Sequence, residues 1–581
     1  MVLSSVPEQG TSLLLIEGCL TAIAFAVAFC WPRIGSAWFS CVERAFSRLA
    51  RRKSLSVAIV GLAALLLRLA ILPACPIPHP FIHDDFSFLL AADTFASGKL
   101  TNPTPAMWVH FESFHITMKP TYMSMYFPAQ GLVLAAGKVL AGHAWFGILV
   151  VTALMCSAIC WMLQAWLPPT WALLGGLLAV LRLGLFSYWI NTYTGAGSIA
   201  ALGGALVLGA LPRLMKGERL RDGLSLAAGL ILLGTSRLYE GILLGLPVLC
   251  LLIWWILFGK NRPAAAVLLR HTALPLTLIV AASAWMGYYN YRVFGSPTTM
   301  PYTVNRAQYG VAPYFVWQSQ RPEPLYRHEV MRKFYEQQEL DGFQKIHSVS
   351  GFFTQTLLKA AEGILFFQGI VLLLPLLMLR RVLLDRRIRF LVLCVLVLMA
   401  GQLVEIYLFP HYLAPFTAAF YGIGLQAMRH LRLWTPGNQP VGLALVRLTV
   451  TLCVVLAGLR LYDKSLHLDL SGAWAAEWYG HRLESGAERA KIAADLGKHP
   501  ERALVIVRYS PDHQPLDEWV YNAADIDNSK VVWAREMDEA ENLELIQYYK
   551  GRTVWLVQPD SRPANVSLYP PHAQELINGN R

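Results

Sequence analysis

Twelve apolar segments of nearly membrane-spanning length, joined mostly by short polar loops, constrain the fold of this chain more than any other feature. A helix needs ~20 consecutive apolar residues to cross a bilayer. With 55% hydrophobic residues and a mean hydropathy of +0.44, the chain is also too apolar for an ordinary soluble protein. We therefore predict a mainly α polytopic membrane protein with about 12 transmembrane helices, near 11–31, 55–73, 143–166, 170–189, 196–212, 222–236, 241–258, 271–290, 352–379, 388–408, 411–428 and 441–461.

Basic residues fall in alternate loops between these segments, which predicts the topology. The clusters are Arg44 to Lys53, Arg213 to Arg221, Lys260 to Arg270, Arg380 to Arg389 and Arg429 to Arg432. This is the positive-inside pattern, so we place these loops in the cytoplasm and both termini outside. The net charge of +12 therefore indicates orientation, and we predict no nucleic-acid partner. No basic residue precedes the first segment, so we expect a retained span rather than a signal peptide.

One apolar segment is too short to count as a span, and the cysteines do not form a metal site. Pro128 to Ala141 is apolar but only fourteen residues long, which favours an interfacial or re-entrant helix. Counting it as a span would also place the later basic loops outside. The nine cysteines lie mostly in apolar segments, where they act as small hydrophobes. Cys156 and Cys160 share a helix face, but no His or acidic residue accompanies them, so we reject a metal site there.

The topology leaves three large outer regions and divides the chain into three parts. Residues 1–54 hold an extra N-terminal span and a basic cytoplasmic loop, and 55–461 form the main membrane domain with outer loops 73–142 and 291–351. Residues 462–581 carry charges throughout and are expected to form a small external α/β domain tethered to the last span. Its predicted strands are 503–508, 531–534 and 553–557, and its predicted helix is 537–549. No phosphate-binding Gly loop follows these strands, so we assign this domain no chemistry.

The tripeptide His83-Asp84-Asp85 lies ten residues beyond an apolar helix, at the start of a helical stretch from Phe86 to Ala96. An Asp at this position can simply cap the helix and complement its dipole. Two adjacent acids exceed what a cap requires. A carboxylate at the membrane surface can also act as a general base toward an acceptor hydroxyl, and we predict that role for Asp84 with Asp85 beside it.

Basic residues near the outer ends of spans are candidates for binding a phosphate. Arginine suits this task because its planar guanidinium donates two parallel hydrogen bonds. Ionisable side chains at this depth usually face a cavity and a partner. Snorkelling, or a structural pair such as Arg237 with Glu240, explains them equally well. The candidates are Arg237, Arg292, Lys119 and Arg68.

Aromatic and polar residues of the outer loops suit a sugar, whose C–H faces stack on rings and whose hydroxyls form hydrogen bonds. The same residues also suit an aromatic belt at the membrane interface. The substrate-binding candidates are His83, Glu112, Tyr126, Tyr239, Glu240, Tyr302 and His411. His110, Glu112 and His115 have only loosely metal-like spacing, so we predict no metal site and no cofactor, and we leave a divalent metal open.

Taken together, these features resemble the GT-C superfamily of polytopic glycosyltransferases. The branch that looks most similar holds dolichyl-phosphate-mannose protein mannosyltransferases and lipid A aminoarabinose transferases. The shared features are a long first outer loop opening on the acidic pair, the segment Tyr122 to Pro128 before an interfacial helix, and a soluble domain after the last span. One departure is the second outer turn, residues 191–195, where some relatives carry an acid and this chain has none. The extra span at 11–31 also lies outside the usual core.

The resemblance implies an inverting transfer of a sugar from a polyprenyl-phosphate donor, with Asp84 as the base. The expected partners are the polyprenyl-phosphate sugar, a glycan, lipid or protein acceptor, and membrane lipid. We expect the protein in a bacterial inner (plasma) membrane with its site on the outer face. Two alternatives stay open: a transporter of lipid-linked glycan and a non-catalytic envelope assembly protein. The transporter should show repeats or broken helices paired across two halves, and the sequence shows neither.

Overall fold

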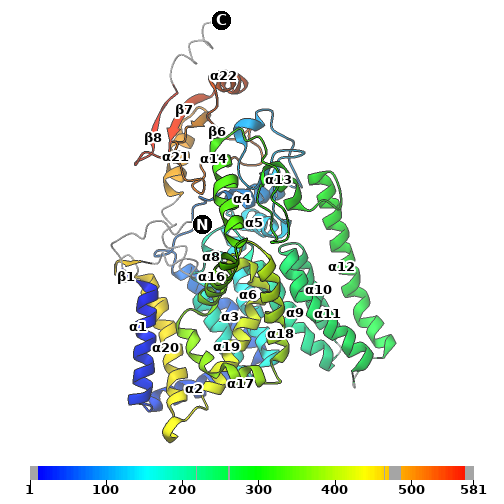
Figure 1. Ribbon diagram of the computed structural model, residues 1–581, viewed down its shortest axis with the longest axis vertical. Coiled ribbons are helices and arrows are strands. Elements are labelled where there is room, and N and C mark those ends of the chain that lie inside the picture. Colours follow the sequence, from blue (N-terminus) through cyan, green and yellow to red (C-terminus); the bar gives the residue numbers. More distant parts are fainter. Residues whose placement is uncertain are drawn as a thin grey trace.

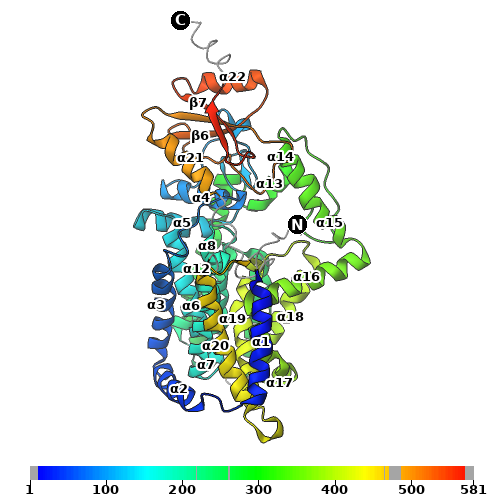
Figure 2. The same cartoon turned by 90° about the vertical axis from the view of Figure 1, so that its left-hand side faces the viewer.

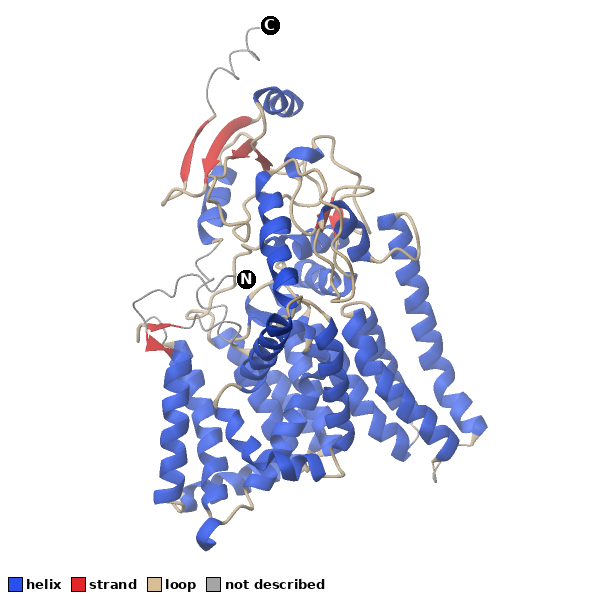
Figure 3. Ribbon diagram, in the orientation of Figure 1, coloured by secondary structure: helices blue, strands red, loops and turns tan. Residues whose placement is uncertain are grey.

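A bundle of apolar helices carries a layer of loops and short helices at one end, and a small sheet domain lies on that layer (Figure 1, Figure 3). The computed structural model describes residues 11–569 apart from 218, 260–261, 263, 463–464 and 470–485. We call the end that bears residues 73–142 and 291–348 the loop-rich end. Figure 2 shows α2 and α17 at the opposite end. The chain is an integral membrane protein.

All twelve predicted segments are helical, but the count of twelve spans is not confirmed. In the described part of the chain, 7 helices are long and apolar enough to cross a membrane, or up to 8 if a bent pair is one span. The seven are α1 (Leu13–Cys30), α3 (Lys53–Ala70), α6 (Trp145–Trp166), α9 (Gly197–Gly217), α11 (Leu238–Phe258), α12 (Ala265–Phe294) and α20 (Val441–Leu461). The shorter ones are α7 (Pro169–Ala179) with η2 (Val180–Gly184), α10 (Leu220–Gly234), α18 (Arg389–Val404) and α19 (Thr417–Leu431).

The bent pair replaces the straight span predicted at 352–379. It consists of α16 (Val349–Gln368) and, after a turn of 105°, η4 (Val371–Met378) with α17 (Leu379–Leu384). Gly369 makes the turn at a φ of +60°, a backbone conformation that favours glycine. Pro375 lies inside the second half and removes one more helical N–H.

The broken backbone at this turn is satisfied by two charged side chains from other helices. Glu17 of α1 accepts hydrogen bonds from the N–H groups of Ile370 (2.9 Å) and Val371 (3.1 Å). Arg182 of η2 donates to the carbonyl of Phe366 (2.8 Å) and to the carbonyl before it. Free backbone groups inside a membrane must find such partners. An acid at the start of one half-helix and a base at the end of the other also match both helix dipoles.

Two short helices near the ends of the bundle bear on the predictions. The prediction of a basic loop at 44–53 is wrong in part, because α2 (Ser36–Ala50) is a helix that runs through most of it. Its apolar residues recur at helical spacing, a pattern that the density of arginines obscured. Residues 128–141 form α5 (Pro128–Ala141), a helix of 14 residues, as expected for a segment too short to cross.

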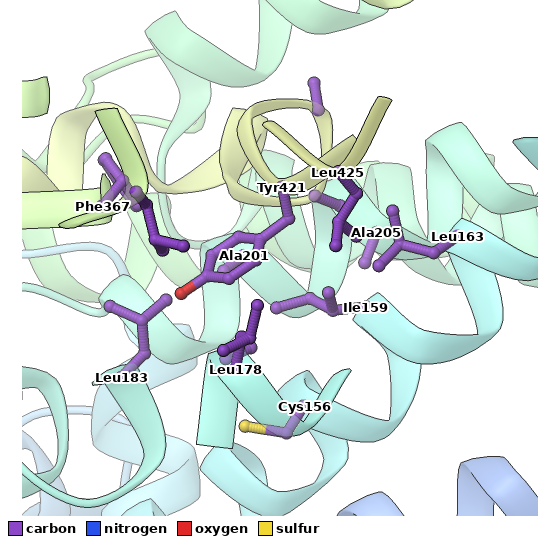
Figure 4. Packing of buried hydrophobic residues seen from close by; sticks show 14 of the residues in the cluster. Cys156, Ile159, Leu163, Leu178, Leu183, Ala201, Ala205, Phe367, Tyr421 and Leu425 are labelled. Carbon is purple, nitrogen blue, oxygen red and sulfur yellow. The ribbon is translucent and has the colours of Figure 1, made fainter. Parts of the chain in front are cut away.

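Close packing of small and large apolar residues forms the core of the bundle. Figure 4 shows Tyr421 and Leu425 of α19 lying against Ile159 and Leu163 of α6. Small residues allow the backbones to approach, as in other membrane helix pairs. A Cβ atom added to Gly204 of α9, for example, would lie only 1.8 Å from the carbonyl oxygen of Pro415.

The loop-rich end contains short elements from both large loops. The first loop supplies α4 (His83–Ala96), η1 (Trp108–Phe111), the paired strands β2 (Ile116–Thr117) and β3 (Met123–Ser124), and α5. The second supplies α13 (Pro301–Tyr309), α14 (Glu329–Arg332), η3 (Lys333–Glu339) and α15 (Leu340–Ile346).

The predicted C-terminal α/β domain is present, and its strands and helix match the expected ranges. It is a four-stranded sheet in the order β6-β5-β7-β8, with β8 antiparallel. The elements are α21 (Ala487–Lys498), β5 (Ala503–Val507), β6 (Val531–Arg535), α22 (Glu539–Tyr548), β7 (Thr553–Gln558) and β8 (Asn565–Leu568).

This domain is packed onto the first loop rather than merely tethered. Leu90 of α4 and Phe111 of η1 share one buried apolar cluster with Ile506 of β5 and Val532 of β6. The domain is therefore attached by packing as well as by its covalent link to the last span. Its apolar surface faces the first loop instead of water, because burial of that surface is favourable.

Candidate functional site

Asp84 and Asp85 occupy the first turn of α4, where their charges complement the helix dipole. They have separate environments. Asp85 is buried and accepts hydrogen bonds from the N–H groups of Tyr193 (2.9 Å) and Phe81 (3.4 Å). It thereby ties the start of α4 to the turn at 191–195. Asp85 is a structural carboxylate in this arrangement.

Asp84 lies in a different cluster and is partly exposed. Its Oδ1 accepts a hydrogen bond from the Tyr126 hydroxyl and lies 2.5 Å from His115 Nδ1. His83 Nε2 lies 3.7 Å from the same oxygen. The other oxygen, Oδ2, has no hydrogen-bond partner among the residues that the structure describes, and the side chain keeps 26% of its surface exposed. An incoming group can therefore reach Oδ2.

His115 is held in a strained position beside this carboxylate. Its φ is +57°, which is uncommon for a residue with a side chain. Its carbonyl accepts hydrogen bonds from the Ser87 hydroxyl (2.6 Å) and from the N–H of Met125 (3.1 Å). Residues held in such conformations cluster at functional sites, because the surrounding structure must stabilise them.

The electrostatics keep Asp84 ionised. Burial alone would raise its pKa, but the neighbouring His115 and His83 and the hydrogen bonds from His115 and Tyr126 outweigh burial and lower it. Burial, helped by the charge of His115, lowers the pKa of His83 to about 4. At neutral pH the cluster therefore holds a carboxylate beside a neutral His83.

His83, Asp84 and His115 are also a set of metal-binding residue types. Their ligand atoms lie within 4.8 Å of one another. Two ligands of one tetrahedral zinc ion with bonds of about 2.0–2.1 Å would lie ~3.4 Å apart. The 2.5 Å between His115 and Asp84 is instead the length of a direct hydrogen bond. These residues could hold a divalent metal only after His115 and Asp84 had moved apart.

A second group of candidates surrounds Arg237, which precedes α11. Its guanidinium lies 3.7 Å from Glu240, donates to the carbonyl of Gly195 (3.2 Å) and stacks 4.3 Å from the centre of the Tyr412 ring. His411, beside Tyr412, lies 2.7 Å from the Tyr188 hydroxyl. Arg237 is thus fixed on several sides at the loop-rich end of the bundle.

The two groups lie close enough to act on one another. The ring of Tyr302 is 5.7 Å from that of Tyr126, and Arg237 lies within electrostatic range of Tyr302. His411 lies within electrostatic range of both Arg237 and Asp84. The structure therefore brings a carboxylate, a guanidinium and several tyrosines to one region.

The other basic candidates do not join this region. Arg68 is buried and donates to the carbonyl of Cys75 (2.9 Å) and to Asn191 (2.8 Å). Arg292 is exposed on α12 and bonds Tyr288 of the same helix. Lys119 lies over the ring of Trp108 on the surface of the first loop. Such contacts fit the alternative to phosphate binding, in which these basic side chains snorkel or form structural pairs.

The remaining candidates differ in position. Glu112 is buried where the two loops meet, and it accepts a hydrogen bond from Tyr309 (2.6 Å) and lies 3.5 Å from His328. Burial raises its pKa, partly offset by the Tyr309 bond and by nearby cations. Tyr239 donates to the carbonyl of Gly401 (2.9 Å). Neither contacts the Asp84 cluster among the interactions described.

Sequence reasoning missed three residues of this region: His115 as the partner of Asp84, Tyr412 as the ring under Arg237, and Lys359. Lys359 of α16 donates to the carbonyl of Glu405 and to that of Gln402 (3.4 Å). No local pattern marks any of the three, because each gains its partner through tertiary structure. The strained φ of His115 is likewise visible only in the structure.

Comparisons with known proteins identify similar folds at low sequence identity. No family model and no curated protein matches the sequence. The structure is similar to that of ArnT from Cupriavidus metallidurans, with 14% identity, a TM-score of 0.47 and coverage of 86% of this chain and 92% of that one. It is also similar to the oligosaccharyltransferase AglB from Archaeoglobus fulgidus, with 10% identity, a TM-score of 0.44 and coverage of 87% and 69%. At these TM-scores the chemistry of the site rests on this chain's own residues.

Proposed function

We propose that the protein is a glycosyltransferase that moves a sugar from a polyprenyl-phosphate donor to an acceptor hydroxyl. The observation that supports this most is the partly exposed Asp84, whose Oδ1 is held by His115 and Tyr126 while Oδ2 is open. A carboxylate oriented in this way, ionised at neutral pH, has the geometry of a general base.

In the proposed reaction the acceptor hydroxyl donates a hydrogen bond to Asp84 Oδ2. Its oxygen forms a bond to the anomeric carbon of the sugar as the bond from that carbon to the phosphate oxygen breaks. The electron pair leaves with the polyprenyl phosphate, and the acceptor proton passes to Asp84. Because the base and the leaving phosphate would stand on opposite faces of the sugar, the transfer would invert the anomeric centre. A weak base suffices, since glycosyl transfer proceeds through an oxocarbenium-like transition state in which charge develops first on the sugar.

Arg237 is the proposed ligand of the donor phosphate. It is the only one of the four basic candidates that the described structure brings near Asp84, through Tyr302 and His411. A guanidinium favours the negative charge that grows on the leaving phosphate. Glu240, 3.7 Å away, keeps the guanidinium in place at a distance that leaves donors available. Tyr126 and Tyr302 supply rings for the sugar.

The proposed location is a bacterial inner membrane, with the loop-rich end on the outer face. The alternation of basic loops supports this orientation. An impermeant thiol reagent applied to intact cells should label Gln320→Cys and not Arg219→Cys, in a background without other reactive cysteines. The reverse labelling would contradict the orientation.

One observation favours the transporter alternative. Transporters commonly contain broken helices paired across two halves of the chain, and the sequence shows no such pair. The break at Gly369 is one broken helix, and the described residues contain no second bent pair to match it. Its free backbone groups are, however, occupied by Glu17 and Arg182 instead of facing a ligand site. Glycosyl transfer therefore remains the function that the site supports best.

The test is a reconstituted transfer assay. Purified protein in liposomes receives polyprenyl-phosphate sugars labelled in the sugar, one at a time, with mixed cell-envelope glycans and lipids as acceptors. We expect label to move to an acceptor with release of free polyprenyl phosphate, and no release by Asp84→Asn. Movement of intact labelled lipid across the bilayer without cleavage would instead establish a transporter.

A further inference from the structure

The two segments that carry the histidines of the Asp84 cluster are both hydrogen-bonded to one residue of the C-terminal domain, Glu518. Phe81 and Ser113 each stand two residues before a histidine, His83 and His115 respectively. The N–H of Glu518 donates to the carbonyl of Phe81 (3.2 Å), and the Ser113 hydroxyl donates to Glu518 Oε2 (3.0 Å). Glu518 thus spans both segments from outside the membrane domain.

The Glu518 carboxylate is buried and fully occupied. Besides Ser113, its Oε2 accepts from Arg535 (2.6 Å), while Oε1 accepts from the Tyr509 hydroxyl (2.9 Å) and the N–H of Val520 (2.8 Å). The side chain is 1% exposed. Burial would raise its pKa, but the charge of Arg535 and these hydrogen bonds outweigh burial and lower it. Glu518 is therefore a buried anion with four donors, as a satisfied buried charge requires.

Further contacts near Glu518 also join the C-terminal domain to the first loop. Arg535 Nε donates to the carbonyl of Glu112 (2.6 Å), and its own carbonyl lies 3.1 Å from His110 Nδ1. On the other side, Phe86 of α4 stacks on Tyr521 with ring centres 4.6 Å apart. The C-terminal domain thereby holds α4 two residues after Asp84 as well as before it.

We infer that Glu518 is a positioning residue for the proposed transfer, so that the C-terminal domain is part of the catalytic unit. It fixes the backbone that leads to His83 and His115, and through them the direction in which Asp84 presents Oδ2. This inference rests on the proposed function for its kinetic consequence. A misplacement of about 1 Å at reacting groups can lower a rate ~100-fold.

The variant Glu518→Gln tests the inference sharply. All four partners donate to the carboxylate, and two of them, Arg535 at Oε2 and the N–H of Val520 at Oε1, cannot accept. An amide nitrogen on either side would therefore face one of these two donors and lose that contact. We expect kcat to fall about 10- to 100-fold. Donor affinity measured without acceptor should stay unchanged, because the phosphate ligand Arg237 lies on a different element. Glu536→Gln is the matched control. It removes a peripheral ion pair of the same domain, with Arg508, that touches neither Phe81 nor Ser113.

A second variant, Ser113→Ala, tests the inference if Glu518→Gln does not fold. A second measurement, backbone hydrogen exchange, tests it if no transferase activity is found. Ser113→Ala removes only the link to the His115 segment, and we expect kcat to fall about 3- to 10-fold with unchanged melting behaviour. Backbone hydrogen exchange should increase at residues 81–87 and 113–117 in both variants and stay unchanged in Glu536→Gln. Wild-type exchange at these segments, or wild-type kcat in both variants, would overturn the inference. A wild-type protein without transferase activity would refute the proposed function, while hydrogen exchange would still decide the positioning role.

Discussion

Replacing Asp84 and Asp85 separately with asparagine should affect two different properties: the first change should lower the transfer rate and the second should lower the stability. Asp84 Oδ1 accepts from Tyr126 and His115, and an Asn carbonyl can keep both bonds while its amide takes the open Oδ2 position. Asp84→Asn should therefore fold with little loss of stability. Its amide cannot take up the acceptor proton, so transfer should fall ~100- to 10,000-fold. This loss equals about 3–5 kcal/mol of transition-state stabilisation.

Asp85→Asn should show the opposite pattern. Asp85 is buried and accepts from the N–H groups of Tyr193 and Phe81, and an amide can accept only one of these bonds. Loss of one hydrogen bond to a charged group typically costs ~1.5–3 kcal/mol. We expect a lower melting temperature and a smaller, indirect loss of transfer at temperatures where the variant is folded.

Both variants are measured in the same liposomes. Initial rates at saturating donor report chemistry, and thermal unfolding followed by intrinsic fluorescence reports stability. Near-normal transfer by Asp84→Asn would refute its role as the base. An inactive Asp85→Asn with unchanged melting would exchange the two roles. A lower melting temperature in both variants, with an equal loss of transfer, would indicate that both residues only stabilise the helix.

Further predictions concern donor binding, the broken span and pH. Arg237→Gln should weaken binding of a polyprenyl-phosphate sugar about 10- to 150-fold by equilibrium titration, the loss of ~1.5–3 kcal/mol, whereas Arg292→Gln should not; equal affinity in both would exclude Arg237 as the phosphate ligand. Glu17→Leu should lower the melting temperature, because two N–H groups at the break lose their acceptor, and an unchanged value would contradict the capping role. The folded pKa of His83, about 4, lies below its ordinary 6.5, so its contribution to stability is complete above pH 6.5 and is lost as pH falls toward 4; His83→Gln should remove that part of the dependence. Because the pKa of Asp84 is lowered, Asp84 should stay ionised between pH 5 and 8, and its protonation should not reduce the transfer rate in that range.

Helices and strands could be predicted from local pattern, but how far each helix runs could not. Apolar segments of the right length marked all twelve helical regions, and short apolar runs of the length of a buried strand marked β5, β6 and β7. The short and bent spans depend on features beyond composition. The break at Gly369 is stable only because Glu17, more than three hundred residues earlier, reaches it. A sequence window does not contain that contact.

Part of the site followed from placement, and the rest required tertiary contacts. Position relative to the membrane singled out Asp84, Tyr126 and Arg237, and the structure brings these three to one region. The adjacency of Asp84 and Asp85 suggested one shared task, but neighbours in a helix turn point in different directions, and the two carboxylates bind different partners. His115 lies 31 residues from Asp84, and only the fold joins them.

The turn at residues 191–195, which carries no acid, has a structural use. Asn191 accepts a hydrogen bond from Arg68 at 2.8 Å, and the N–H of Tyr193 donates to Asp85 at 2.9 Å. The turn therefore holds the first turn of α4 through Asp85, while Glu518 holds the segment just before α4 through Phe81. An acid at position 193 or its neighbours would stand beside Asp85 and raise the cost of burying that charge. The arrangement thus favours a reaction scheme with one reactive carboxylate, Asp84, whose partner is a histidine of the first loop instead of a second acid.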